Sequence, residues 1–184
     1  TPESVTTHAN AFSAGLRDAG VAVAIKHFPG LGRVTADTDS TADVVDDVTT
    51  TDDEQIDVFR SGIDAGAELV MVSTAVYSRI DPDQPAAFSP AVVTDLLRGD
   101  LGFDGLVITD DLSGAEQVHA WSPADRAISA IDAGVDLVLV SKVPDVAPEM
   151  VQAVVHLARV DDGFRAKVET AWQRVVAAKA TLLG

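Results

Sequence analysis

The chain has 184 residues, of which 47% are hydrophobic, so it is long enough to form one domain with a sizeable core. Its 29 Asp and Glu residues against 13 Lys and Arg give a formal net charge of −16, which argues against a nucleic-acid or anionic-membrane partner. The absence of Cys excludes disulfides, thiolate catalysis and zinc-thiolate sites, and leaves the compartment open. No apolar run approaches the ~18 residues of a membrane span.

Helix starts are marked by a hydroxyl residue followed by proline, at Thr1-Pro2, Ser89-Pro90 and Ser122-Pro123. Each pair places a capping oxygen before a residue whose φ already suits the first helical turn. The stretch Thr51-Asp52-Asp53-Glu54 predicts a fourth helix start of the capping-box type. Helix ends are predicted where glycine can adopt the left-handed conformation, at Gly20, Gly66 and Gly134.

Each of these glycines leads into a short apolar run that predicts a β-strand, namely Val21–Ile25, Ala67–Ser73 and Val135–Ser141. The last two share the pattern Asp-Ala-Gly-x-[Glu/Asp]-Leu-Val-x-Val-Ser, an internal repeat of a helix-to-strand junction. Leu106–Thr109 predicts a fourth strand, and C-terminal helices are expected after the run Val135–Ser141, as far as Leu183.

Strands that are apolar on both faces and separated by helices indicate a parallel sheet. Four such units fit either a small doubly wound sheet or half of an eight-stranded barrel, which typically needs about 250 residues. The acidic, Thr-rich stretch from Thr41 to Asp53 is interpreted as a solvated loop, with covering of a pocket as the alternative. On the last helix, Trp172 is interpreted as a packing residue.

The segment that follows the first strand concentrates unusual chemistry between Lys26 and Asp39. Lys26 is suited either to donate hydrogen bonds to ligand hydroxyls or, if burial lowered its pKa, to form a Schiff base as in aldolase-like chemistry. His27 beside it is expected to contact the same ligand. Adjacent strand residues point to opposite faces, so both can reach one ligand only if the backbone is irregular. A cis peptide at Phe28-Pro29, or next to it, is predicted to supply that irregularity.

Two pairs of carboxylates are further candidates for the site. Asp37 and Asp39 are either neighbours on one face of an extended loop, where mutual repulsion raises one pKa, or solvated acids in an Asx-turn. Asp110 and Asp111 follow the strand Leu106–Thr109, at the strand end where barrel enzymes keep catalytic groups. One carboxylate with a separate proton donor suits glycoside hydrolysis, whereas a Mg²⁺ site would need a third oxygen ligand at fixed spacing, which the chain lacks.

The segments Lys26–Gly32 and Phe103–Leu112 closely resemble the two signature segments of family 3 glycoside hydrolases, in the subgroup of bacterial β-N-acetylglucosaminidases. Pro85–Pro90 and Asp95–Arg98 resemble the helix that links them, and the similarity preserves segment order over essentially the whole chain. The resemblance implies a (β/α)8 TIM-type barrel of the α/β class. Residues 1–184 would then form its C-terminal half, strands five to eight.

The resemblance also implies hydrolysis of β-linked N-acetylglucosamine- or glucose-type glycosides, by a retaining two-step mechanism that needs no cofactor or metal. Asp110 would be the nucleophile, Lys26 and His27 would hold sugar hydroxyls, and Asp111 would support substrate binding. Tyr77 and Arg79 are second-tier candidates. A carbohydrate is then the expected partner, and an isolated half-barrel, inactive by itself, is expected to self-associate through its open sheet edges.

The sequence departs from the subgroup at the acid/base. In the subgroup that the chain resembles, the loop after the fifth barrel strand ends in Asp-Ser-His, and that His is the general acid/base. Here the same positions are Asp37-Thr38-Asp39. Histidines expected at two other positions are replaced by Leu31 and Thr74. With a raised pKa, Asp39 would take over proton transfer, with Asp37 in support. The alternative is a catalytically degenerate carbohydrate-binding relative with the same pocket.

Overall fold

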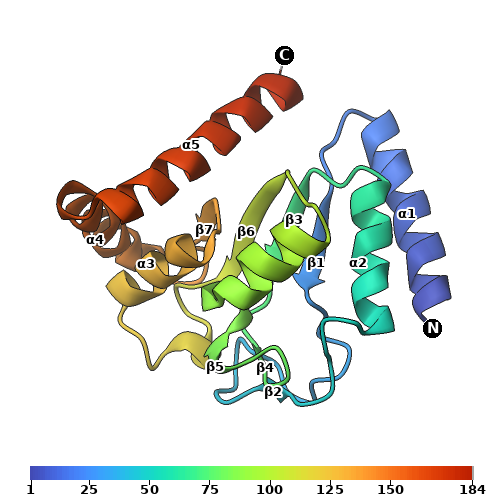
Figure 1. Ribbon diagram of the computed structural model, residues 1–184, viewed down its shortest axis with the longest axis horizontal. Helices are drawn as coiled ribbons and strands as arrows, with labels where there is room; N and C mark the ends of the chain where they lie inside the picture. The colour runs from blue at the N-terminus through green and yellow to red at the C-terminus, as the bar shows by residue number, and fades with distance from the viewer. Residues whose placement is uncertain (184) are drawn as a thin grey trace.

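The computed structural model describes residues 1–183 and shows an α/β fold built on a four-stranded sheet (Figure 1). Its strands run in the order β1 (Ala24–Phe28), β3 (Leu69–Val72), β6 (Leu106–Asp111) and β7 (Leu137–Leu139). Every pairing in this sheet is parallel, which confirms the prediction. A doubly wound sheet reverses its strand order at a switch point. Here the order follows the chain without reversal, as it does in a barrel.

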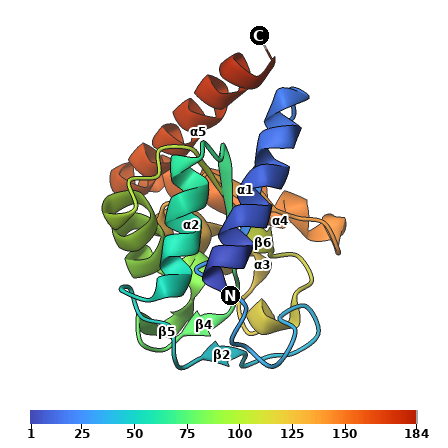
Figure 2. The ribbon, with the colours of Figure 1, turned by 90° about the vertical axis from the view of Figure 1, so that its right-hand side faces the viewer.

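Helices alternate with these strands, as the sequence predicted. They are α1 (Pro2–Asp18), α2 (Glu54–Asp64), the π-helix η2 (Ala91–Asp100), α3 (Pro123–Ala133), α4 (Ala147–Val160) and α5 (Asp162–Leu183). Three short 3₁₀ turns, η1 (Ala86–Phe88), η3 (Glu116–Val118) and η4 (Pro144–Val146), complete the connections. Helices α1 and α2 lie side by side (Figure 2), and α2 packs against β1. Of the helices in residues 1–183, none combines the length and the apolar character needed to cross a membrane.

Most of the predicted helix boundaries are confirmed. The side chains of Thr1 and Ser122 cap α1 and α3, and Gly20, Gly66 and Gly134 all have positive φ. The predicted capping box is wrong. Helix α2 is capped by Asp53, which accepts from the Gln55 backbone N–H and also pairs with Arg33. The ion pair fixes Asp53 at the helix start, so Thr51 remains outside it.

A second, small sheet that the sequence analysis missed lies at the carboxyl end of the main one (Figures 1 and 2). It contains β2 (Val45–Asp46), β4 (Val76–Tyr77) and β5 (Asp81–Pro85). The stretch Thr41–Asp53 is therefore a solvated loop only in part, because it contains β2 and the buried residues Val44, Asp46 and Thr49. Asp46 is buried and accepts from the backbone N–H groups of Val48 and Thr49 and from the Thr49 hydroxyl. These bonds are local, but the pairing of β2 with β4 joins segments about thirty residues apart, for which no local pattern exists.

Two strand boundaries also differ from the prediction. Strand β1 begins at Ala24 rather than Val21, because its register with β3 starts where Ala24 faces Leu69. Strand β6 continues through Asp110 and Asp111, so these acids end the strand instead of following it. The core lies between the main sheet and its covering helices and includes Phe28 and Val107.

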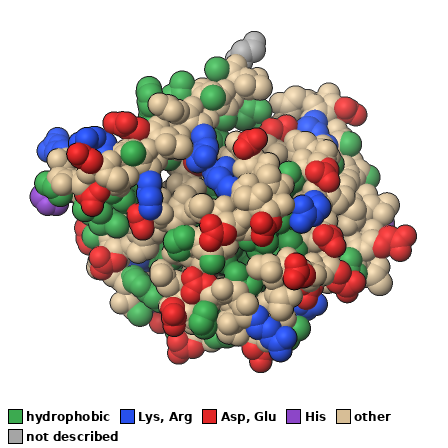
Figure 3. Space-filling view, viewed as in Figure 1, with side chains coloured by type: hydrophobic (Ala, Val, Ile, Leu, Met, Phe, Trp, Pro, Cys, Tyr) green, Lys and Arg blue, Asp and Glu red, His purple; other side chains and the backbone are tan. Residues whose placement is uncertain are grey.

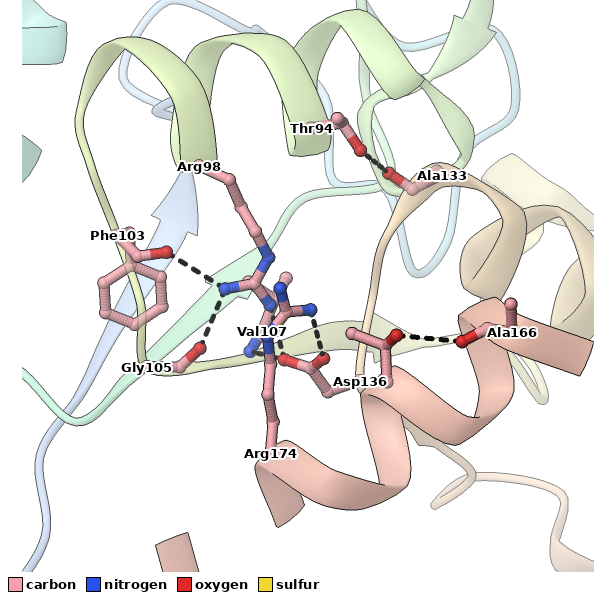
Figure 4. A network of polar contacts seen from close by, with 10 residues as sticks. Thr94, Arg98, Phe103, Gly105, Val107, Ala133, Asp136, Ala166 and Arg174 are labelled. Carbon is pink, nitrogen blue, oxygen red and sulfur yellow. Dashed lines mark hydrogen bonds and ion pairs between the residues drawn. The ribbon is translucent and has the colours of Figure 1, made fainter. Parts of the chain in front are cut away.

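The amino end of the sheet is closed by a buried ion network (Figure 4). Asp136, at the start of β7, accepts from Arg98 of η2, from Arg174 of α5 and from the Val107 backbone N–H. Arg98 also donates to two carbonyls of the turn before β6. In the other copy of the internal repeat, Glu68 likewise accepts the Val23 backbone N–H beside β1. The repeat therefore uses one acid per copy to join neighbouring strands.

Helix α5 crosses this amino end (Figure 1). Its residues Ala177 and Leu182 line a hollow with Gly105, which lies immediately before β6. The interpretation of Trp172 as a packing residue is wrong, since this side chain is 63% exposed. Acidic side chains are spread over the face shown in Figure 3, in keeping with the net charge of −16.

Candidate active site

The two strand ends that the sequence analysis singled out meet at the carboxyl edge of the sheet. His27 on β1 and Asp110 on β6 project past β3, which lies between their strands. The His27 Nε2 is 3.6 Å from the Asp110 Oδ2, and the two side chains are 26% and 20% exposed. A histidine and a carboxylate that are close, half-buried and still reachable by solvent form a candidate active site.

The end of β1, which carries His27, and the loop that follows it have an irregular backbone and are held by buried contacts. The peptide bonds Lys26–His27 and Phe28–Pro29 are both cis, and the second confirms the prediction. Phe28 is fully buried, and its ring packs edge-on against Phe59 with 5.2 Å between centroids. Tyr77, a second-tier candidate, is also buried, and its hydroxyl donates to the Gly30 carbonyl at 2.8 Å. Tyr77 therefore anchors the loop from below.

His27 has an electrostatic environment suited to a neutral imidazole. Burial lowers its pKa below the ordinary value of 6.5, the Asp110 charge opposes that effect, and Lys26 adds to it. The charge of Asp39 raises the pKa slightly, which places that carboxylate within electrostatic reach of the ring. At neutral pH the ring is uncharged, so it can donate one hydrogen bond and accept another.

Asp110 is held by one oxygen and leaves the other available. Its Oδ1 accepts from the Asp111 backbone N–H at 2.9 Å, while Oδ2 faces His27. A carboxylate fixed at one oxygen and accessible at the other can attack a carbon atom or accept a hydrogen bond. Lys26, the chain neighbour of His27, is exposed, so the described residues do not provide the burial that Schiff-base chemistry requires.

Asp111, the neighbour of Asp110, is buried, and its oxygens are bound by other residues of the chain. Both of its oxygens accept hydrogen bonds from the Ser113 hydroxyl, and further donors are the backbone N–H of Gly114 and both groups of Ser141. Burial alone would raise its pKa, but these donors outweigh that effect and lower the pKa to about 2. The structure therefore gives Asp111 the task of tying the end of β6 to the residues after β7, whereas the sequence indicated substrate binding.

Asp37 and Asp39 form the Asx-turn that the sequence analysis left open as an alternative. Asp37 Oδ1 accepts from the Asp39 backbone N–H at 3.1 Å, and its other oxygen accepts from the Ser40 hydroxyl. The extended arrangement is therefore wrong. Asp39 is exposed, and the hydrogen bonds at its backbone oxygen come from Glu116 and Lys142. At the two other replaced histidine positions, Leu31 packs against the core and Thr74 is buried.

The sequence analysis missed Gln117, Ser141 and Lys142, which surround the site from the loops after β6 and β7. Their contacts join residues 30 to 103 positions apart, so local patterns carried no signal for them. Ser141 is the exception, because it ends one copy of the internal repeat. In residues 1–183, no group of three or more His, Asp or Glu side chains is placed to hold a metal ion.

Comparison with known proteins identifies the same family over nearly all of the chain. Residues 1–178 match the model of the glycosyl hydrolase family 3 N-terminal domain. The chain is 37% identical over 158 residues to a beta-hexosaminidase of Stenotrophomonas maltophilia, which covers 84% of this chain and 45% of that protein. A beta-hexosaminidase of Xanthomonas oryzae pv. oryzae is 38% identical over 155 residues, covering 83% and 46%.

Comparison with solved structures leads to the same family. The chain matches a beta-N-acetylhexosaminidase from Beutenbergia cavernae with a TM-score of 0.96 and 66% identity, over 97% of this chain and 53% of that one. It matches a family 3 beta-N-acetylglucosaminidase from Paenibacillus with a TM-score of 0.86 and 30% identity, over 95% and 34%. The chain thus spans about half the length, or less, of the relatives it matches.

Proposed function

The chain belongs to glycosyl hydrolase family 3, and from that premise we propose that the full-length protein hydrolyses β-linked N-acetylglucosamine- or glucose-type glycosides. The observation that carries the proposal is the approach of His27 to Asp110 across the carboxyl edge of the sheet. Relatives named beta-hexosaminidase support the choice of sugar.

We further propose that residues 1–184 form the C-terminal half of a (β/α)8 barrel. The four parallel strands follow one another without reversal, and β1 and β7 each pair with one neighbour within the described residues. Apolar side chains of α1 and α2, including Phe12 and Phe59, line a hollow of about 480 Å³ beside β1. Four more strand and helix units would cover that hollow and close the pocket.

In the proposed reaction, Asp110 is the nucleophile of a retaining mechanism. Its free oxygen bonds to the anomeric carbon while the glycosidic C–O bond breaks, and Asp39 gives a proton to the departing oxygen. Water then attacks the same carbon, Asp39 takes one of its protons, and the Asp110 ester is released. His27 and Lys26 hold sugar hydroxyls, and the Asp111 contacts keep the Asp110 backbone fixed.

The test is cleavage of a chromogenic β-N-acetylglucosaminide and a β-glucoside by the full-length protein. We expect turnover with the wild type and a loss of roughly 10⁴-fold or more with Asp110→Asn, which keeps the shape but removes the nucleophile. Asp132→Asn, an exposed change on α3 far from the site, is the matched control and keeps full activity. Equal activity of Asp110→Asn and wild type would remove Asp110 from the mechanism.

The degenerate alternative rests on the replacement of a histidine by Asp39, and the same assay decides it. If neither aryl glycoside is cleaved while N-acetylglucosamine raises the melting temperature, the protein binds sugars and does not cut them. The 184-residue chain by itself is expected to be inactive and to pair through the β1 and β7 edges. Sedimentation as a monomer would contradict that pairing.

A further inference from the structure

The loop that carries Asp39 is held mainly by residues outside its own strand. Within the loop, the turn at Asp37 fixes only local geometry. Its outward contacts come from two other strand ends. The Thr38 carbonyl accepts from the Gln117 backbone N–H at 3.1 Å, and the Asp39 carbonyl accepts from the Glu116 backbone N–H and from the Lys142 Nζ, each at 3.2 Å. The position of Asp39 therefore depends on the loops after β6 and β7.

Gln117 makes hydrogen bonds to this loop at two residues, Thr38 and Val44. Besides the bond to Thr38, its side-chain Oε1 accepts from the Val44 backbone N–H at 2.7 Å, and its Nε2 donates to the Val44 carbonyl at 3.3 Å. Gln117, Thr38 and Val44 are all buried. The Gln117 side chain thus satisfies both backbone polar groups of Val44, and the Gln117 backbone N–H binds the Thr38 carbonyl. A single residue therefore holds both ends of the segment from 38 to 44.

Gln117, which makes these hydrogen bonds, is joined to the proposed nucleophile by a short, hydrogen-bonded segment of the chain. Gln117 follows Asp110 by seven residues, and the segment between them is fixed by the hydrogen bonds of Asp111 to Ser113 and Gly114. On the opposite side, the aliphatic stem of Lys142 packs so closely over Gly114 that a Cβ built there would lie 2.9 Å from the Lys142 Cδ. Lys142 is therefore seated against the same segment from which Gln117 reaches the loop.

From this geometry we propose that Gln117, assisted by Lys142, is a positioning residue that sets the place of the Asp39 carboxylate relative to Asp110. The inference rests on the proposed function, because it concerns the proton transfer that Asp39 would perform. Neither side chain touches the reacting atoms. Gln117 acts through the backbone of the loop, and Lys142 acts through the Asp39 carbonyl.

A displaced proton donor leaves a distinct kinetic signature. A dinitrophenyl leaving group departs as a stable anion and needs no proton, whereas a phenyl leaving group needs one. In the full-length protein, Gln117→Met removes both side-chain hydrogen bonds at similar volume. We expect kcat/KM for the phenyl β-N-acetylglucosaminide to fall about tenfold or more, and that for the dinitrophenyl glycoside to fall less than about twofold. Lys142→Met, at an exposed position that leaves the fold intact, should shift the ratio in the same direction by a smaller factor.

Two further variants interpret the result. Thr94→Val removes one hydrogen bond, to the Ala133 carbonyl, at the opposite end of the sheet and should leave the ratio of the two substrates unchanged. Gln117→Met combined with Asp39→Asn should show no loss beyond that of Asp39→Asn alone, because both act on one proton transfer. The inference would be overturned if a variant lost kcat/KM equally on both substrates. It would also be overturned if neither Gln117→Met nor Lys142→Met changed the ratio of kcat/KM between the phenyl and the dinitrophenyl glycoside. Either result would leave the proposed function standing. A wild type that cleaves neither substrate would overturn the proposed function, and this inference with it.

Discussion

At the amino end of the sheet, Asp136 is fully buried and both of its oxygens are bound by Arg98, Arg174 and a backbone N–H. At the carboxyl end, Asp110 is 20% exposed, and the one basic side chain within 4 Å of it in the described part of the chain is the imidazole of His27, at 3.6 Å. The two acids occupy opposite ends of neighbouring strands. The first has no oxygen left for a ligand, whereas the second has one.

The comparison shows how one sheet separates stability from chemistry. A buried carboxylate with every oxygen bound stabilises the fold only while all of its partners remain, because a lone buried charge is very costly. A partly bound carboxylate is less useful for stability but can bind a substrate. Asp111 shows that position alone does not decide this, since it adjoins Asp110 yet is bound as completely as Asp136.

The largest loss of stability is expected for a change at the amino end of the main sheet, at Asp136. Asp136→Ala leaves the buried guanidinium of Arg98 without its counter-ion, so we expect the free energy of unfolding to fall by about 3–5 kcal/mol. Urea denaturation of the full-length protein measures this. Asp132→Ala, which breaks an exposed pair with Lys167, is the matched control and should cost at most about 1 kcal/mol. Asp110→Ala should also change stability little. Equal losses for Asp136→Ala and Asp110→Ala would erase the distinction between the ends.

A smaller effect is expected for Asp111, and it depends on pH. Its pKa is about 2 in the folded protein, against an ordinary value of 3.8, so the unfolded state binds the proton more readily. The stabilisation, about 2 kcal/mol, is therefore complete above pH 4 and is lost as the pH falls through 2. Asp111→Asn should lower stability by about that amount at pH 7 and match the wild type near pH 2. Urea midpoints across this range test the prediction, with the exposed Asp83→Asn as control. A difference that persists unchanged at pH 2 would contradict it.

Tyr77→Phe tests how firmly the segment after β1, next to His27, is held in place. The change removes only the hydroxyl that donates to the Gly30 carbonyl, so we expect a loss of about 1 kcal/mol in the free energy of unfolding. Amide hydrogen exchange should speed up around Gly30 and remain unchanged near Asp136. Unchanged exchange around Gly30 would show that the core contacts of Phe28 hold the loop without Tyr77.

The smallest change concerns the charge of His27. The Asp110 carboxylate raises the pKa of His27 against the larger lowering by burial, so Asp110→Asn should lower that pKa further. An NMR titration of the ring protons measures it, and the exposed His8 in the same spectrum is the internal control. A pKa that rises in the variant would mean that the two side chains do not interact as the 3.6 Å contact indicates.

Features that depend on neighbours along the chain could be predicted from the amino-acid sequence. Capping hydroxyls at Thr1 and Ser122 and glycines such as Gly134 marked helix boundaries, because each acts on backbone groups within a turn. Apolar runs predicted the parallel strands, and the family signatures placed Asp110 and His27 at strand ends. The 3.6 Å approach of those two residues came from the folded sheet, in which the parallel strands β1 and β6 end at one edge.

Which polar groups are already hydrogen-bonded within the protein could be seen only in the folded chain. Composition and spacing alone do not show which of Asp110 and Asp111 is bound by the protein itself, because the donors to Asp111 come partly from Ser141, thirty residues away. Gln117 reaches Val44 across 73 residues, and no period or cap records such a contact. A hydrogen bond between distant residues depends on the packing of whole elements, so the availability of a carboxylate for chemistry is fixed only when the chain is folded.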